Sequence, residues 1–321
     1  MAALALVQSP PSARAADIQA LFVRAGQPEF SATFDRSYRV REQFGLRSWL
    51  GIEDARVVLH ISVSPEPFSC GARRLVGGLP GDLMADTTHR QFWHPLKLVR
   101  AMVADVKREG KLDFLLTSFV PAAEAVFRAA GFQRFAPLQR HVTPLVWPYP
   151  LARRLLHGEG RARLTALPFT DARAIAALVG LSSPDVMRTL PSAEYYTTRM
   201  PRQEYPTGTW LLAGDPATPD AMVLVSPTPR RDLTIADVIW RDARVRLAGV
   251  LSGVAAWAAR QRHRRAYLTT IPGTRLAVAA QRAGFLPRPS EAAVMLLPLT
   301  DPGTIPPPDQ WALTPFALTG W

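Results

Sequence analysis

FLLTSFVPAAEAVFRAAGF, residues 114–132, has a second copy later in the chain. YLTTIPGTRLAVAAQRAGF, residues 267–285, aligns with it without gaps at an offset of 153 residues, and both copies end in Ala-Gly-Phe. Each copy predicts a short strand, a loop and an amphipathic helix. We expect the helices to stop at Gly131 and Gly284, because glycine takes the left-handed conformation that often closes a helix.

The similarity extends upstream of both copies. Residues 48–65 (SWLGIEDARVVLHISVSP) and 209–227 (TWLLAGDPATPDAMVLVSP) each predict a strand, a polar turn and a second strand. Residues 81–86 (GDLMAD) and 235–242 (IADVIWRD) then predict an apolar strand that ends in aspartate. A period near 150 residues is too long for a solenoid and indicates a duplicated domain.

A long helix follows each of these strands, over residues 95–109 and 243–259. Both halves thus have the order helix, hairpin, strand, long helix, strand, helix, strand. Proline and glycine cluster in residues 147–163, which predicts a boundary there and two domains, 1–150 and 151–321. The second domain ends in a proline-rich and then aromatic tail, which we expect to dock as a strand on the second sheet.

The length and composition allow two packed domains, and the charge distribution argues against a nucleic-acid-binding protein. The chain has 321 residues, 48% of them hydrophobic, and a net charge of +12. Its positive excess is mostly arginine and is spread over both halves, with 18 Lys and Arg against 13 Asp and Glu in the first 150 residues and 20 against 13 in the rest. A solvated basic surface explains this better than a nucleic-acid footprint, so we expect no nucleic-acid partner.

The single cysteine, Cys70, excludes an intrachain disulfide and favours a reducing compartment, so we expect a cytoplasmic protein. Residues 1–15 lack the positive charge that opens a signal peptide, and we expect a frayed start there. No apolar run reaches the length of a membrane span. The histidines are scattered and form no metal-binding spacing with Cys70, so we expect no metal.

The element order and the two Gly-Phe segments resemble the GNAT N-acetyltransferase superfamily, and the duplication resembles its tandem members. This resemblance implies an α+β fold with two GNAT-like domains, each a mixed, mostly antiparallel sheet flanked by helices. LMADTTHRQFWHPLKLV, residues 83–99, is similar to the segment with which the family binds acyl-CoA. The family's pantetheine pairs with a strand edge and its pyrophosphate sits at a helix start. The resemblance therefore implies a donor site formed by Met84, Ala85, Arg90, Gln91, Phe92, Trp93 and His94.

This chain departs from the family's phosphate loop. Trp93 stands where the family has a glycine, and Pro95 replaces a small residue and removes one N–H donor. Phe127 stands where many members have the tyrosine that protonates the leaving thiolate. In the second half, Arg246 and Gly249 fit the loop pattern, but Leu251 ends it. The resemblance thus implies a first-half loop with reduced phosphate-binding capacity and a second copy further from catalysis.

Asp82 is the candidate general base. A subgroup of the family has an aspartate, an apolar stretch and then a His-Arg pair, which match Asp82 and the pair His89-Arg90. The alternative is a surface or capping aspartate. Tyr196 and Arg199 are candidate substrate-binding residues in a cleft between the halves, and we expect Asp86 to form an Asx-turn with Thr88.

The resemblance implies an acyl-CoA-dependent N-acyltransferase with acetyl-CoA as donor, bound in the first half, and an amine of a small molecule or peptide as acceptor. One alternative is a non-catalytic GNAT-like binding or assembly protein, which Trp93, Pro95 and Phe127 favour. Another is a Fem-type transferase that uses aminoacyl-tRNA, which the positive charge permits. We expect no membrane partner.

Overall fold

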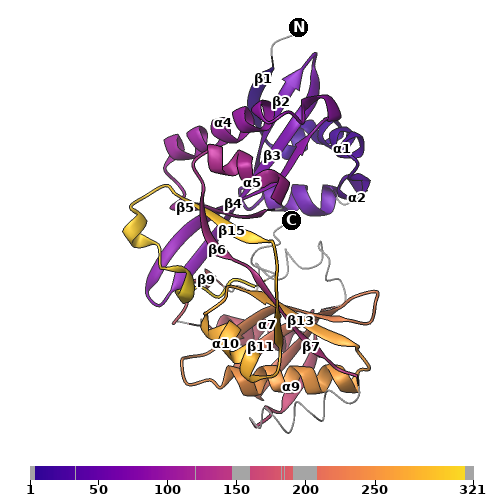
Figure 1. The fold of residues 1–321 in the computed structure, drawn as a ribbon, viewed down its shortest axis with the longest axis vertical. Coiled ribbons are helices and arrows are strands. Elements are labelled where there is room, and N and C mark those ends of the chain that lie inside the picture. The colour runs from indigo at the N-terminus through magenta and orange to yellow at the C-terminus, as the bar shows by residue number, and fades with distance from the viewer. Residues whose placement is uncertain are drawn as a thin grey trace.

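Two β-sheets with helices on their faces form the protein (Figure 1). The structure is a computed structural model, and it describes residues 4–32, 34–119, 121–146, 160–181, 183, 185–190 and 208–314. Both sheets are mixed and mostly antiparallel, as the sequence predicts. Among the described residues, no helix is long and apolar enough to cross a membrane.

The first half follows the predicted element order. Its strands are β1 (Ala5–Ser9), β2 (Arg47–Glu53), β3 (Arg56–Cys70), β4 (Arg73–Ala85), β5 (Phe114–Phe119), β6 (Gln133–Pro137) and β7 (Gln139–Pro144). Its α-helices are α1 (Ala15–Arg24), α2 (Pro28–Ala32), α3 (Val40–Glu42), α4 (Trp93–Glu109) and α5 (Pro121–Ala129). Residues Asp35–Arg39 form one turn of π-helix, and Pro11–Arg14 and Thr87–His89 form short 3₁₀ helices.

The second half repeats much of this order. Its strands are β8 (Leu164–Pro168), β9 (Arg188–Thr189), β10 (Thr209–Asp215), β11 (Thr218–Pro227), β12 (Leu233–Trp240), β13 (Arg265–Thr270), β14 (Leu286–Arg288) and β15 (Ala293–Pro298). Its α-helices are α7 (Ala172–Val179), α9 (Leu247–Arg260) and α10 (Arg275–Arg282), and short 3₁₀ helices lie at Pro302–Thr304 and Pro308–Gln310. Gly131 and Gly284 follow α5 and α10 with φ of 100° and 81°, which confirms the predicted glycine stops.

The two sheets exchange one strand each. The first sheet has the order β1-β2-β3-β4-β5-β15-β6, with β9 beside one end of β3, and the second has β14-β7-β13-β12-β11-β10-β8. Thus β7 of the first half lies between β13 and β14, and β15 of the second half lies between β5 and β6 (Figure 1).

Linker length explains why β7 leaves the first sheet. Only Leu138 separates β6 from β7, and a hairpin needs at least about two loop residues. The chain therefore continues from β6 into β7 without reversing, and β7 pairs with β13 of the second sheet instead of folding back onto β6. The Leu138 N–H donates to Ala292 O at 2.9 Å. This bond joins the segment that crosses to the second sheet, before β7, to the segment that crosses back, before β15.

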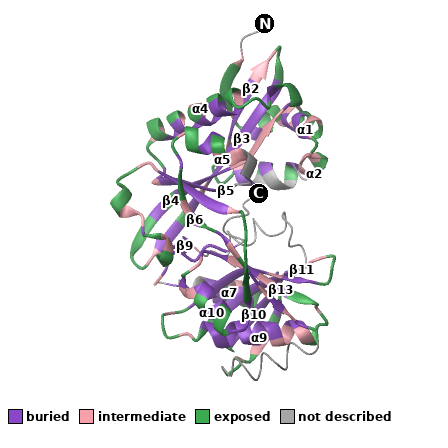
Figure 2. Ribbon diagram, viewed as in Figure 1, coloured by how far each residue is buried: buried purple, intermediate pink, exposed green. Residues whose placement is uncertain are grey.

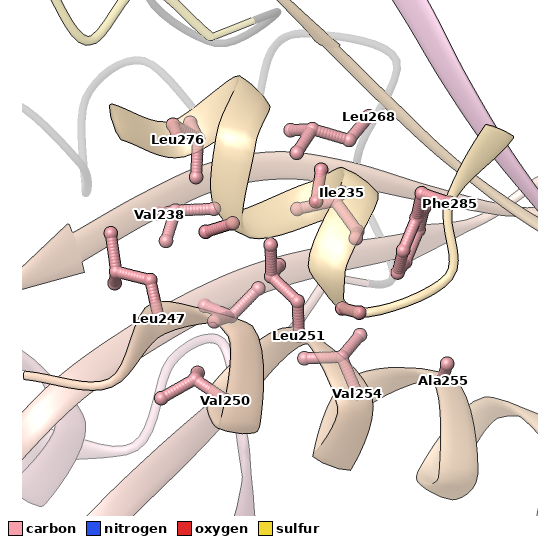
Figure 3. Close-up of a cluster of buried hydrophobic side chains, with 14 of the residues drawn as sticks. Ile235, Val238, Leu247, Val250, Leu251, Val254, Ala255, Leu268, Leu276 and Phe285 are labelled. Carbon is pink, nitrogen blue, oxygen red and sulfur yellow. The ribbon is translucent and has the colours of Figure 1, made fainter. Parts of the chain in front are cut away.

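Helices pack on both faces of each sheet, and the sheets between them are largely buried (Figure 2). In the first sheet, α4 and α5 pack on one face and α1 on the other. In the second, α7 packs on one face and α9 and α10 on the other. Figure 3 shows α9 and α10 meeting over the strands, with Leu251, Leu276 and Ile235 in the shared core.

One expectation about the chain ends is wrong, and the other is contradicted over the described part of the tail, residues 300–314. Residues 5–9 are not frayed but form β1, which pairs with β2 from Ala5 opposite Ile52 to Ser9 opposite Ser48. The described part of the tail, up to residue 314, forms no strand on the second sheet. Instead, the fully buried Trp311 packs against first-sheet aromatic rings, because a large apolar side chain gains more from burial there than from a strand edge.

Candidate functional site

A bulge in β4 positions Asp82. Two residues of β4, Asp82 and Leu83, lie opposite the single residue Ile61 of β3, and Asp82 has a φ of 53°. Aspartate tolerates this left-handed conformation better than most residues do. The last residue of β4 paired with β5 is Gly78, so the bulge lies where the two parallel strands have separated. Bulges often direct one side chain into a functional site.

Tyr38 and Ser62 hold one oxygen of the Asp82 carboxylate. The Tyr38 hydroxyl donates to Oδ2, and Ser62 Oγ donates to the same oxygen at 3.4 Å. Tyr38 is only 1% exposed, and burial together with the nearby Asp82 charge raises its pKa well above the usual 10. Tyr38 therefore stays a neutral donor. Asp82 itself is half-buried, and Oδ1 has no hydrogen-bond partner among the described residues, so this oxygen is available to a ligand.

His60 fixes the backbone of the bulge. Its Nδ1–H donates to the Asp82 carbonyl oxygen at 3.0 Å, which leaves Nε2 to accept from Ser48 Oγ at 3.0 Å. His60 is fully buried with its ring edge-on to Phe22, and burial lowers its pKa, so the ring stays neutral. A neutral ring with this tautomer satisfies both hydrogen bonds at once.

Sequence reasoning named Asp82 as a candidate, a prediction that remains untested, but it did not point to Tyr38 and His60, which contact Asp82. Tyr38 lies 44 residues upstream, in the π-helical turn, and His60 lies within a mostly apolar strand. Only the register of β3 on β4 and the packing of the upstream helices bring these side chains to Asp82. No local sequence signal could have indicated them.

Asp86 anchors the loop after β4. It is buried and accepts from Arg24 at 2.9 Å and from Arg56 at 2.5 Å. These two guanidinium groups outweigh burial and lower the pKa of Asp86 to about 2. The expected Asx-turn with Thr88 is wrong, because the carboxylate is engaged by the two arginines and by the Thr87 hydroxyl at 3.2 Å.

His89 ties the same loop to β2. Its Nε2–H donates to Glu53 at 3.0 Å and its Nδ1 accepts from Thr88 Oγ1 at 2.9 Å. The histidine is buried rather than solvated, so a simple surface role is excluded. Asp86 and His89 together hold the loop rigidly in front of α4.

Arg90 joins the end of β4 to the end of α1. Its guanidinium donates to Ala25 O at 2.8 Å and to Ala85 O at 3.4 Å, and the side chain is exposed. Arg90 therefore makes no salt bridge with a described carboxylate. Met84 and Ala85 close β4, with Met84 packed toward the α1 core and Ala85 toward the α4 core. Met84, Ala85 and Arg90 thus lie two to eight residues after Asp82, with Arg90 bonded to Ala85 O.

The start of α4 has backbone N–H groups without an intrachain partner among the described residues. No described backbone carbonyl accepts from the N–H groups of Gln91, Phe92 or Trp93, whereas the His94 N–H donates to Gln91 O at 3.1 Å and Pro95 has none. These three N–H groups lie at the positive end of the helix dipole. Trp93 is 66% exposed, with its ring beside that of Phe92, so it does not fill a gap in the core.

In the second sheet, the chain itself occupies the corresponding gap. The last residues of β12 and β13 in register are Ile235 and Leu268, and beyond them β12 binds other segments. Ser183 bonds Trp240 through both its N–H and its hydroxyl, at 2.9 Å and 3.0 Å, and Arg188 donates to Val238 O at 3.0 Å.

A buried ion pair reinforces this closure. Arg188 and Asp237 are each 2% exposed and lie 3.0 Å apart. Asp237 also accepts from the Thr314 hydroxyl, at 2.9 Å. Gly249 of the second loop pattern packs against the chain too, since a Cβ there would lie 2.7 Å from Gly160 O. The part of the chain that the structure describes thus leaves one strand gap open, the one beside Asp82.

Tyr196 and Arg199, the predicted substrate-binding residues, lie outside the described residues. Within the described ranges, no three His, Cys, Asp or Glu side chains are grouped as metal ligands.

Comparison with known proteins supports the fold. No known family profile matches the sequence, and no curated protein matches it. Among solved structures, a probable N-acyltransferase from Enterococcus faecalis V583 superimposes with a TM-score of 0.68 and 9% identity, over 92% of this chain and 73% of that one. A GCN5-related N-acetyltransferase from Anabaena variabilis gives 0.64 and 11%, with the same coverage.

A tandem GNAT protein from the clavulanic acid biosynthesis pathway gives a TM-score of 0.57 at 14% identity, over 92% of this chain and 99% of that protein. This likeness spans both sheets and agrees with the internal repeat. The chain therefore has the fold of the GNAT-type N-acetyltransferases, as two GNAT-like domains in tandem.

Proposed function

We propose that the protein is an acyl-CoA-dependent N-acyltransferase whose first half carries the reaction. The donor in this proposal is acetyl-CoA, and the acceptor is an amine of a small molecule or peptide. The observation that carries the proposal is the half-buried Asp82, which lies beside the one open strand gap with an unpartnered Oδ1 among the residues that the structure describes.

Asp82 accepts the proton of the attacking amine in this reaction. The proton leaves as the amine nitrogen bonds to the thioester carbon and the C–S bond breaks; the thiolate that leaves takes a proton from solvent, and Asp82 later returns its proton to solvent. Tyr38 and Ser62 hold Oδ2, which leaves Oδ1 without a partner among the described residues. General bases of this kind contribute about 10²–10⁴-fold to rate.

The start of α4 and the free edge of β4 are the donor-binding elements in this proposal. Beyond Gly78 no described strand pairs with β4 on its β5 side, although the Thr117 hydroxyl donates to Pro80 O at 3.1 Å, so the stretch from Gly81 to Ala85 suits an extended ligand. The free N–H groups of Gln91, Phe92 and Trp93 suit a pyrophosphate. Because Pro95 and His94 contribute no free donor, we expect weaker binding than a complete glycine-rich loop would give.

Thiol release from acetyl-CoA with a panel of amines tests the activity. We expect Asp82→Asn to lower kcat by about a hundredfold or more while acetyl-CoA still binds. Asp54→Asn is the matched control, because Asp54 is exposed and also has a positive φ, of 49°. Full activity of Asp82→Asn would overturn the role of Asp82.

Calorimetry with acetyl-CoA tests the donor site separately. We expect micromolar binding that weakens with salt, and Arg90→Ala should weaken it further by releasing the loop from Ala25. No binding of the native protein at millimolar acetyl-CoA would contradict the proposal and favour a GNAT-like protein that does not acylate.

A further inference from the structure

A basic pocket of about 650 Å³ lies on the second sheet, away from Asp82. Strands β7, β13 and β14 and the residues next to them form it. Its lining contains four arginines, one tyrosine, one serine and four aliphatic residues: Arg140, Arg264, Arg265, Arg288, Tyr267, Ser290, Val142, Pro144, Val146 and Pro289.

Strand register places the charged groups on one face. Arg140 of β7 lies directly opposite Arg288 of β14, and on its other side β13 contributes Arg265 and Tyr267. The alternate residues of β13, such as Leu268, point to the opposite face and pack under α9 and α10. Arg140, Arg265 and Arg288 therefore face away from these helices, and Arg264, just before β13, completes the lining.

The charges of this pocket are poorly balanced by the described acids. Asp232 is the nearest carboxylate with a defined contact, accepting from the Tyr267 hydroxyl at 3.1 Å and lying 3.8 Å from Arg265. Within the described ranges, no carboxylate bonds Arg140, Arg264 or Arg288, although the exposed Glu291 follows the lining residue Ser290 in the chain.

Directly opposite like charges destabilise a sheet. The Arg140–Arg288 pair therefore costs free energy in the protein alone, and a bound anion would recover it. A basic surface that served only solubility could keep its arginines apart and would not need two arginines directly opposite each other.

The pocket is held in place before any ligand binds. The Arg140 guanidinium lies over the Tyr267 ring, 5.5 Å from its centre. The backbone of Arg264 is bonded on both sides, donating to Arg231 O at 2.8 Å and accepting from Leu145 N–H at 2.9 Å. Such preorganisation reduces the entropy lost on binding.

We propose that this pocket binds a nucleoside polyphosphate. The arginines bind the phosphate groups, because a guanidinium fork matches phosphate oxygens in geometry and charge. The aliphatic residues Val142, Pro144 and Pro289 offer an apolar surface for the base. The volume lies within the usual range of small-ligand sites, about 300–1,000 Å³.

This pocket shares no residue with the Asp82 site, so the assignment is independent of acyl transfer. It also lies at the start of β13, at the opposite end of that strand from the point where β12 and β13 separate.

Calorimetry on the full chain tests the proposal, with ATP, inorganic triphosphate, adenosine and a single-stranded oligothymidylate as probes. We expect ATP to bind more tightly than triphosphate or adenosine. Arg140→Gln and Arg288→Gln should each weaken ATP binding about tenfold or more, the usual effect of losing a charged hydrogen bond. Arg128→Gln is the matched control, since Arg128 is exposed on α5 in the first half.

Thermal unfolding separates a lost site from a lost fold. Without ligand, Arg288→Gln should melt at the native temperature or slightly above it, because it relieves the repulsion with Arg140. ATP should raise the melting temperature of the native protein and of Arg128→Gln, and at the same concentration should raise that of Arg140→Gln by clearly less.

Three results would overturn the proposal. The first is no ATP binding at millimolar concentration. The second is inorganic triphosphate binding as tightly as ATP, which would show that the apolar surface contributes nothing. The third is oligothymidylate binding more tightly than ATP with the same loss in both variants, which would assign the face to nucleic acid.

Discussion

Single buried residues decide how the protein responds to acid. His60 and His141 are both buried, and burial lowers the pKa of each. His60 has partners for both ring nitrogens, whereas neither nitrogen of His141 has a partner among the described residues. An unpaired buried polar group costs about 1–3 kcal/mol.

The free energy of unfolding should therefore fall as the pH drops below about 6.5, the ordinary pKa of histidine. In that window the unfolded chain binds protons that the folded His60 and His141 do not, so acid favours unfolding. Asp86 affects the free energy of unfolding in a separate pH range. Its pKa of about 2 means that its stabilisation is lost only as the pH falls from about 4 toward 2.

Urea unfolding at pH 7 and at about pH 5 measures this effect. His141→Leu should be more stable than the native protein by about 1 kcal/mol at pH 7, and by more at the lower pH. His263→Gln, at a half-exposed histidine, is the control. A His141→Leu variant that is less stable at both pH values would show that the ring has a partner beyond the described residues.

At the residue scale, the sequence predicts less of the site than of the fold. Asp82 could be named as a candidate from a short motif, because all residues of that motif lie within ten positions of one another. Tyr38 and His60 reach it only through packing and strand register, which no local pattern encodes. Trp93 reads as core from its type, but it is exposed, since an apolar side chain on a surface loop need not be buried.

At the scale of elements, Gly249 belongs to the second-half pattern that resembles a phosphate loop, but in the structure it serves the close packing of α9. Gly249 and Gly253 lie one turn apart, and a Cβ on either would lie 2.7 Å from a backbone oxygen, of Gly160 and Ala162 respectively. The Ala162 N–H also donates to Gly249 O at 3.0 Å. Glycine is needed at both positions because the chain before β8 crosses the helix at that point.

Gly249→Ala should therefore destabilise the protein by about 2 kcal/mol, as other over-packing substitutions do, although alanine favours a helix more than glycine. Gly160→Ala should have little effect, because a Cβ added at Gly160 would have no neighbouring atom within 4 Å. Chemical unfolding of the two variants against the native protein measures the difference. Equal stability of both variants would mean that the chain before β8 can shift away from α9 at no cost.

Elements themselves were well predicted, because periodicity and glycine stops are local signals. The repeat located β5 with α5 and β13 with α10, and the hairpins β2–β3 and β10–β11 follow from alternating apolar residues with a polar turn. The pairing partners of β7 and β15 could not be predicted from the sequence. Each of these strands could join either sheet at an equivalent position, and which sheet it joins depends on whether the preceding linker can reverse the chain.

At the scale of the whole molecule, the strand exchange makes each half incomplete without the other. The first sheet needs β15 between β5 and β6, and the second needs β7 between β13 and β14. Trp311 adds a further tie, packing in the first-sheet core next to Phe68 and Phe114 while Thr314, three residues on, bonds Asp237 of β12. Unfolding of one sheet thus exposes unpaired strand edges of the other.

We therefore expect the two sheets to unfold in a single transition, and the halves to fold only together. Residues 1–150 expressed alone leave β7 without its sheet, and residues 151–321 alone leave β15 without its own. Exposed strand edges of this kind promote aggregation. Co-expressed fragments should instead form one stable complex, visible by size-exclusion chromatography and circular dichroism. A fragment that folds alone as a cooperative monomer would show that its exchanged strand can return to its own sheet, against the one-residue linker at Leu138.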